Sequence, residues 1–282
     1  MSDVLSRWPS MVRLVLRQVH AQLRMFWRTP IALFFTIMLP LIMLVLFNAL
    51  FGGNMVETDQ GLWPVNQFYT GGLAAFTAVS ATYTNLANMV PIRREEGVLK
   101  RWRGTPLPTS VYLSGYVGSA IVLAAAGAAI MLTVGVLAYD LHIEAAKVPA
   151  MIVTFLVGVF AFSALGLAVA ALVPNARSAA AVANATILPL AFVSNVFIPL
   201  ENPPQWLETV GNIFPLKPFA VSFQDTLNPL VPAPAFNWGK LGFVALWGVA
   251  GAIVAVRYFR WEAAPGTTPS RGRRRSRAQA SA

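Results

Sequence analysis

Charged side chains are concentrated in one connector, PIRREEGVLKRWRGTPLP at residues 91–108. Prolines bound it on both sides, and it is long enough for about two helical turns along a membrane surface. Its apolar members can pack on a membrane body while its acidic and basic members face the cytoplasm: Val98, Leu99 and Trp102 in the first group, and Glu95, Glu96, Lys100 and Arg101 in the second. Such an amphipathic segment would suit docking to a soluble partner. An ordinary positively charged inner loop is the alternative, and charge alone favours that alternative.

Motifs for catalysis or metal binding are absent from the sequence. It contains no G-x-x-x-x-G-K-[ST] segment for nucleotide phosphates, no H-E-x-x-H, no cysteine and only two histidines, His20 and His142. We therefore predict no catalytic residue, no metal site and no cofactor in this chain.

A polar stripe runs along one apolar stretch, because Thr70, Thr77, Ser80, Thr84 and Asn88 recur at helical spacing. Polar groups in hydrocarbon are costly unless they are paired, so this stripe should face other helices or a water-accessible path. Hydrogen bonding between helices explains it as well as a pathway does. Asn184 and Asn195 add further uncharged polar groups near a later apolar stretch.

Six long segments, almost free of charge, could place these residues in a membrane. They are Pro30–Phe51, Gln67–Val90, Ser110–Tyr139, Val148–Val173, Ser178–Leu200 and Lys240–Val256. Each is close to or above the roughly 20 residues that an α-helix needs to span a bilayer. The sequence predicts an all-α integral membrane protein with six transmembrane helices.

The basic residues give this protein an orientation. If the connectors alternate between two sides, all of the 21 Lys and Arg residues except Lys147, Lys217 and Lys240 fall on the side of the two termini. Cytoplasmic loops carry the excess of Lys and Arg, so both termini are predicted to be cytoplasmic. The net charge of +10 then reflects contact with lipid headgroups, and we expect no nucleic-acid partner.

Residues 1–29 are predicted to form an amphipathic helix in the membrane interface. At helical spacing, Trp8, Val12, Val15, Val19, Leu23 and Phe26 share one face, whereas Arg13, Arg17, His20, Arg24 and Arg28 share the opposite face. The membrane domain follows at 30–260, and 261–282 reads as a disordered basic cytoplasmic tail. The Pro-rich, apolar segment Glu201–Trp238 is expected to form short helices that re-enter the outer leaflet.

Two stretches resemble a known family. The run REEGVLKRWRGTPL at residues 94–107 is similar to the inner-loop signature of type-2 membrane subunits of ATP-binding-cassette exporters, which include the daunorubicin-resistance permeases. Val98 and Trp102 stand where the family usually has Thr and Leu. The stretch FVSNVFIPLENPPQWL at 192–207, followed by NIFPLKP at 212–218, is similar to the family's outer re-entrant segment, with Asn195 near a position that is commonly Gly.

The resemblance implies a permease subunit of an exporter in the plasma membrane. Two such subunits, identical or related, would pair with two separate cytoplasmic P-loop ATPase subunits, which bind the ATP and Mg²⁺. The connector would be the coupling helix, with residues Arg94, Glu95, Glu96, Gly97, Leu99, Lys100, Arg101 and Trp102. The interfacial helix would brace it, with Arg13, Arg17, Arg24 and Arg28 toward lipid headgroups or a cytoplasmic partner. Thr77, Ser80, Thr84, Asn88, Asn184 and Asn195 are the candidates for lining the substrate path. Uncharged lining residues favour an amphipathic or hydrophobic cargo such as a drug, lipid or glycolipid.

Two other classes of function stay open from the residues. A stand-alone secondary transporter is disfavoured because no ionisable residue lies at mid-span, although sodium coupling through uncharged oxygens would not need one. A membrane scaffold without transport activity is the third possibility.

Overall fold

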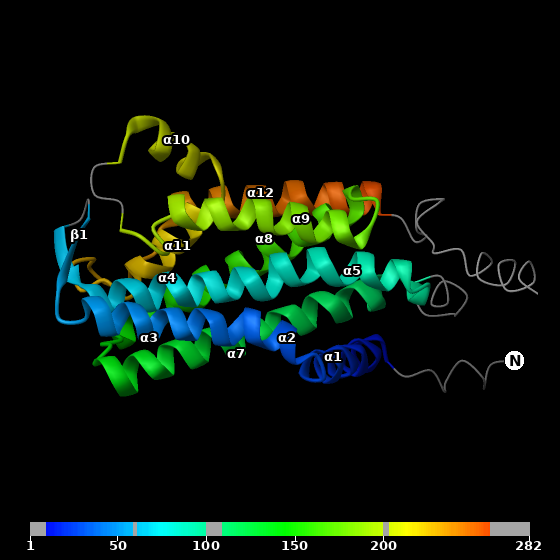
Figure 1. Ribbon diagram of the computed structural model, residues 1–282, viewed down its shortest axis with the longest axis horizontal. Helices are drawn as coiled ribbons and strands as arrows, with labels where there is room; N and C mark the ends of the chain where they lie inside the picture. The colour runs from blue at the N-terminus through cyan, green and yellow to red at the C-terminus, as the bar shows by residue number, and fades with distance from the viewer. Residues whose placement is uncertain (1–9, 59–60, 100–108, 200–202, 260–282) are drawn as a thin grey trace, which may run out of the picture.

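The computed structural model describes residues 10–58, 61–99, 109–199 and 203–259. It is a bundle of long helices that run along one axis (Figure 1). In chain order the first half contains α1 (Met11–Trp27), α2 (Pro30–Leu33), the π-helical turn η2 (Phe34–Met38), α3 (Leu39–Phe51), β1 (Met55–Thr58), β2 (Gly61–Pro64), α4 (Val65–Val79), the π-helical turn η3 (Ser80–Thr84) and α5 (Asn85–Glu95). The second half contains α7 (Thr109–Tyr139), the 3₁₀ turn η4 (Ala145–Lys147), α8 (Val148–Leu172), α9 (Ala176–Val193), α10 (Gln205–Ile213), α11 (Leu216–Asp225) and α12 (Trp238–Tyr258).

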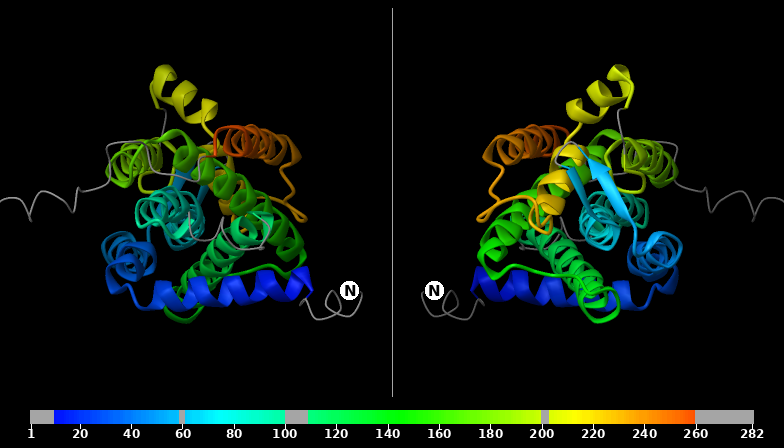
Figure 2. Two further views of the ribbon diagram at one scale, coloured as in Figure 1. Left: turned by 90° about the vertical axis from the view of Figure 1, so that its right-hand side faces the viewer. Right: turned by 90° about the vertical axis from the view of Figure 1, so that its left-hand side faces the viewer.

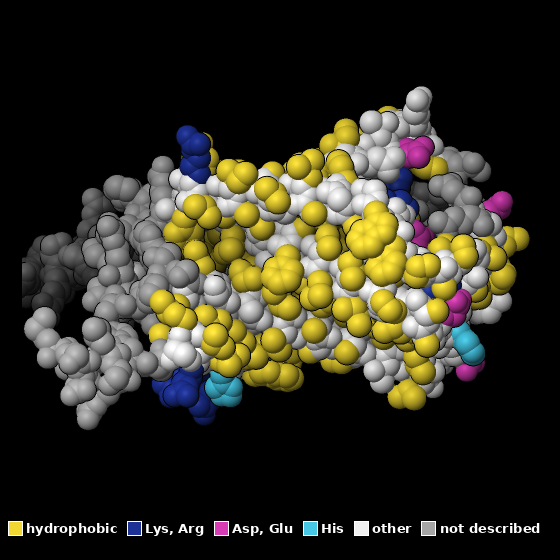
Figure 3. Space-filling model, turned by 180° about the vertical axis from the view of Figure 1, so that it is seen from behind, with side chains coloured by type: hydrophobic (Ala, Val, Ile, Leu, Met, Phe, Trp, Pro, Cys, Tyr) yellow, Lys and Arg dark blue, Asp and Glu magenta, His cyan; other side chains and the backbone are white. Residues whose placement is uncertain are grey.

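The two ends of the bundle differ. One end, which we call the basic end, holds α1, the end of α5, the turn between α8 and α9, and the end of α12. The opposite end, which we call the hairpin end, holds the β1–β2 hairpin with α10 and α11 (Figure 1). Apolar side chains cover the middle of the molecule between charged groups at the two ends (Figure 3).

Within the described residues, five helices are long and apolar enough to cross a membrane: Phe34–Phe51, Val111–Tyr139, Ala145–Leu172, Ala176–Val193 and Trp238–Tyr258. The chain is therefore a multi-pass membrane protein with an almost entirely helical fold. These five helices correspond to five of the six predicted segments. The sixth segment, Gln67–Val90, is also helical and is formed by α4, η3 and α5, but it is not among those five.

Burial explains why that segment is less apolar. Every residue from Gln67 to Val79 is buried, and α4 packs against α3, α7, α8 and α11. A helix surrounded by protein can carry polar groups that lipid would not tolerate. Thr70 and Thr77 of the polar stripe thus lie at the centre of the bundle, whereas Ser80, Thr84 and Asn88 are half-buried.

The hairpin end contains an element that the sequence analysis did not predict. Strands β1 and β2 pair in antiparallel register, with Val56 opposite Trp63, and both of these side chains are buried. The helices α10 and α11 are short, as the prolines of this region predict. The predicted tail, 261–282, and Trp8 lie outside the described residues.

Candidate functional site: the connector at the basic end

The connector, residues 91–108, begins within the last turns of α5, which ends at Glu95. Glu96 caps the helix, and Gly97 follows with φ +71° while its amide donates a hydrogen bond to the Arg94 carbonyl at 3.1 Å. A Cβ atom built on Gly97 would meet nothing within 4 Å, so the left-handed backbone alone favours glycine here. The predicted coupling residues Lys100, Arg101 and Trp102 lie outside the described residues.

Arg94 points into the protein. It is only 4% exposed, and its guanidinium donates to the carbonyl of Ala170 at 3.3 Å and to that of Val173 at 2.6 Å. These carbonyls lie at the C-terminal end of α8, where the helix leaves its last carbonyls without partners in the helix and the helix dipole favours a cation. Arg94 is one of the predicted ATPase-coupling residues, and in this structure its charge is used inside the bundle.

Glu95 holds the next helix. Its Oε1 accepts a hydrogen bond of 2.7 Å from the amide of Ala176, the first residue of α9. Asn175 caps the same helix by accepting from the Ser178 amide at 2.8 Å. A carboxylate at a helix N-terminus is favourable because it meets free amides and the positive end of the dipole. We call Arg94, Glu95 and their partners Ala170, Val173 and Ala176 the helix-end clamp.

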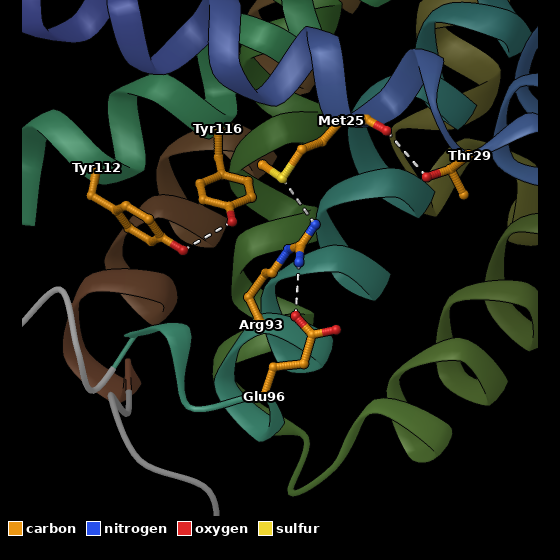
Figure 4. A network of polar contacts seen from close by, with 6 residues as sticks. All are labelled: Met25, Thr29, Arg93, Glu96, Tyr112 and Tyr116. Carbon is orange, nitrogen blue, oxygen red and sulfur yellow. Dashed lines mark hydrogen bonds and ion pairs between the residues drawn. The ribbon is translucent and has the colours of Figure 1, made fainter.

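Arg93 links the connector to α1. Figure 4 shows the Arg93 side chain between Met25 of α1 and Glu96, with Tyr116 and Tyr112 of α7 to its left. Its guanidinium nitrogens lie 2.7 Å from the Glu96 carboxylate and 3.3 Å from the Met25 sulfur. The two tyrosines also bond to each other, because the Tyr112 hydroxyl donates to the Tyr116 hydroxyl at 2.9 Å. The sequence analysis did not select either tyrosine, although their i, i+4 spacing at the start of α7 was a visible signal.

Leu99 anchors the connector through apolar contact. It is 0% exposed and belongs to a buried cluster at the basic end with Leu86, Val90, Tyr112, Tyr116, Ala120 and Ala170. These residues come from α5, α7 and α8. The described part of the connector, which ends at Leu99, is therefore packed onto three helices.

The helix α1 lies across the long axis of the bundle (Figure 2). It packs on α7, where Gly115 and Gly118 provide the space: a Cβ on Gly115 would lie 2.1 Å from the Gln18 Cγ, and one on Gly118 would lie 2.7 Å from the Val19 Cγ2. The predicted apolar face divides in two. Val15, Val19, Leu23 and Phe26 pack inward wholly or in part, whereas Val12 is exposed, as are Leu16 and Trp27.

The predicted basic face of α1 is exposed. Arg13, Arg17, His20, Arg24 and Arg28 all lie on the surface. A helix with one face packed on protein, one exposed apolar stripe and one basic stripe has the composition of an interfacial helix.

The predicted substrate-path residues are not all alike. Thr77 is buried against Gly127 of α7, and its hydroxyl donates to the Leu73 carbonyl at 2.7 Å, so its own helix satisfies it. Thr84 Oγ1 and Asn88 Oδ1 are buried and have no hydrogen-bond partner among the described residues. Ser80 is half-buried in η3, and Asn184 lies on the exposed face of α9. Asn195 is at the hairpin end, where it borders a cavity of about 430 Å³.

The sequence is similar to known membrane transport proteins. Residues 14–227 match the family model of the ABC-2 type transporter. The chain is also 25% identical, over 223 residues, to the daunorubicin resistance ABC transporter permease protein DrrB1 of Streptomyces coeruleorubidus, a match that covers 74% of this chain and 76% of the relative. The chain therefore belongs to the ABC-2 type transporter family. Members of this family are membrane components of ABC transporters, which associate with ATPase subunits, and are not enzymes themselves.

Proposed function

We propose that this chain is the permease subunit of an ATP-driven exporter. It would span the plasma membrane six times with both termini in the cytoplasm, α4, η3 and α5 forming the second span. The domain limits would be 1–29 for the interfacial helix, 30–260 for the membrane domain and 261–282 for the cytoplasmic tail. Separate P-loop ATPase subunits would bind the ATP and Mg²⁺.

The helix-end clamp is the observation that carries this proposal. It joins the exposed connector to the ends of two long helices through one buried cation and one carboxylate. A force applied to the exposed side of the connector, where the carboxylate of Glu96 lies, would reach α8 and α9 without passing through a flexible loop. Such a link suits a machine that moves between two arrangements under the control of a partner.

The uncharged character of the central polar groups supports an amphipathic or hydrophobic cargo. The buried oxygens of Thr84 and Asn88 that lack partners among the described residues offer acceptors without charge. We infer that a second permease subunit, identical or related, covers the exposed apolar residues of α3 and α9, which include Ile42, Val45, Leu188 and Phe192. The cargo would then pass between the two subunits, and Thr84, Asn88 and Asn184 are our candidates for contacting it.

Glu96→Lys tests the docking role of the connector. Within the residues that the structure describes, the exposed Glu96 carboxylate forms its ion pair with neighbouring Arg93, so its reversal should leave the membrane part folded. We expect at least a tenfold loss of the P-loop ATPase that co-purifies from the host membrane, measured by quantitative mass spectrometry. Glu57→Lys, the same charge change on exposed β1 at the hairpin end, is the matched control and should retain the ATPase.

Two outcomes would replace the proposal. Transport by the purified chain in vesicles with an ion gradient and no ATPase would establish a secondary transporter. Absence of any co-purifying P-loop ATPase from both wild type and Glu57→Lys, with no transport, would favour a scaffold.

A further inference from the structure

The side of the bundle formed by α7, α8 and α12 carries an apolar groove, which we call the α7–α12 groove. Its volume is about 910 Å³, within the range of small-molecule sites in proteins. Its described lining residues are apolar except Ser163 and Gly248, and they include Leu113 and Val117 of α7, Phe160 and Leu167 of α8, and Val256 and Phe259 of α12. Figure 3 shows this side of the molecule, which is covered with apolar side chains.

Unequal packing of the three helices creates the groove. The helices α8 and α12 pack closely, since a Cβ on Gly248 would lie 2.8 Å from the Ala161 Cα. The helix α7 contacts α8 much less extensively, and it lines the groove through Leu113 and Val117, near its start at the basic end. The groove is therefore bounded by α8 and α12 along its length and by α7 near the basic end.

The length of the groove indicates what fills it. On α12 the groove runs from Ala245 to Phe259, which is about 21 Å at 1.5 Å per residue. A partner helix that crosses the membrane needs about 30 Å of apolar surface, whereas the lipid tails of one leaflet need about half of that depth. The groove begins at the basic end and ends inside the bilayer, so its length favours lipid tails over a spanning helix.

The groove lies away from the surface that we assign to the second permease subunit. Figure 2 shows α12 (orange) on one side of the bundle and α3 (blue) and α9 (yellow-green) on the other. A molecule in the groove would therefore contact neither the proposed subunit interface nor the cargo path along it. Such a molecule would be a resident part of the protein and not its cargo.

Exposed arginines lie at the basic end of the groove. Arg257 belongs to the last turn of α12, directly after the lining residue Val256. Arg13 and Arg17 are exposed on α1, which packs on α7 at the same end. None of these three arginines forms an ion pair with another residue that the structure describes. Free guanidinium groups beside an apolar groove favour an anionic headgroup, because arginine binds phosphate oxygens through two parallel hydrogen bonds.

We propose that the α7–α12 groove binds an anionic phospholipid, with its tails along α8 and α12 and its phosphate near Arg257 and the arginines of α1. A zwitterionic lipid could fill the same apolar space, but its headgroup brings no net negative charge to the arginines. The bound lipid would link α12 to α1, two elements from opposite ends of the sequence. The proposal goes beyond the proposed function, and only the statement that the lipid comes from the cytoplasmic leaflet would rest on the proposed orientation.

Native mass spectrometry of the purified full-length chain tests the site, because it resolves bound lipids by mass. The probes are phosphatidylglycerol and phosphatidylcholine with identical acyl chains, titrated separately into the detergent-solubilised protein. We expect the affinity for phosphatidylglycerol to be higher by on the order of tenfold. Equal affinities for the two lipids would overturn the proposal.

Ala252→Phe tests the position of the tails. It places a ring in the groove at an exposed lining position, whereas Ala250→Phe makes the same change at an exposed position of α12 that does not line the groove. We expect Ala252→Phe to weaken the binding of both lipids roughly tenfold, because the ring occupies space that the tails need, and Ala250→Phe to leave binding unchanged. Equal binding in the two variants would show that the tails lie elsewhere and would overturn the assignment.

Arg257→Gln tests the position of the headgroup and should not affect folding, because Arg257 is exposed. It should lower the affinity for phosphatidylglycerol about fivefold and leave that for phosphatidylcholine unchanged. Arg177→Gln makes the same change at an exposed position in the first turn of α9, also at the basic end, and should have little effect. Equal affinity for phosphatidylglycerol in the two variants would overturn the assignment. No ATPase takes part in this measurement, so a failure of ATPase co-purification would leave it unaffected, and the two proposals fail separately.

Discussion

The two ends of α8 are each held by a buried cation, but the cations differ in origin. At the hairpin end, Lys147 is 1% exposed, and its ammonium bonds to the Glu144 carboxylate at 2.7 Å and to the Asn228 carbonyl at 2.8 Å. Lys147 belongs to the turn directly before α8. At the basic end, the cation is Arg94, which belongs to α5 and is separated from its partners by an entire helix, α7.

This difference separates an anchor from a link. A cation from the adjacent turn can only fix the position of the helix end. We propose that a cation from the connector would move the helix end when the connector moves, and that Glu95 would do the same for α9. On this proposal, placement in the sequence gives a buried cation a static role at the hairpin end and a transmitting role at the basic end.

Exchanging each cation for methionine tests this comparison most strongly. Arg94→Met should leave the last carbonyls of α8 without their charged donors and should lower the free energy of unfolding by about 2–3 kcal/mol. Lys147→Met should cost a similar amount. Thermal denaturation measures the loss of stability in both variants. Transport per folded molecule, measured by ATP-dependent efflux with the ATPase present, should fall only in Arg94→Met. Equal loss of transport per folded molecule in both variants would remove the distinction.

Gly118→Leu tests whether α1 braces the basic end. The new side chain would occupy the space of Val19, since even a Cβ lies 2.7 Å from the Val19 Cγ2. We expect α1 to separate from α7, at a cost of about 1–3 kcal/mol. Trypsin should then cleave faster at the exposed arginines of α1, whereas Val122→Leu, on an exposed position of α7, should leave cleavage unchanged. Equal protection in both variants would argue against close packing of the two helices.

Gly97→Ala makes the smallest change. Because Gly97 has φ +71° and open space around it, alanine should cost about 1 kcal/mol through backbone strain alone. The loss of stability should be smaller for Gly97→Asn, since asparagine tolerates the left-handed region. Gly242→Ala, with open space and ordinary helical backbone, should not destabilise the protein in thermal denaturation. Stability of Gly97→Ala equal to that of Gly242→Ala would contradict the predicted strain.

Much of the fold follows from the sequence because long apolar segments have few alternatives. The first predicted segment, Pro30–Phe51, coincides with α2, η2 and α3. The third, Ser110–Tyr139, differs from α7 only in beginning one residue later than that helix. Helix length in a bilayer is set by hydropathy and bilayer thickness, and both can be read from the chain. The β1–β2 hairpin was missed because its strands have only four residues each.

The direction of the connector's side chains could not be read from the sequence. Arg94 and Glu95 look like a solvated pair of charges, and only the position of the α8–α9 turn shows that they match two helix ends of opposite polarity. The same limit applies to the polar stripe. Spacing places Thr77 and Thr84 on one helix, but whether each hydroxyl is satisfied depends on its own carbonyl neighbours and on packing.

Labelling of intact cells tests the central claim that the connector faces the ATPases in the cytoplasm. The chain has no cysteine, so Glu96→Cys and Glu57→Cys each introduce one unique thiol at an exposed position. With a membrane-impermeant maleimide, Glu57→Cys should be labelled in intact cells, and Glu96→Cys should be labelled only after the membrane is opened. Labelling of Glu96→Cys from outside intact cells would contradict the account.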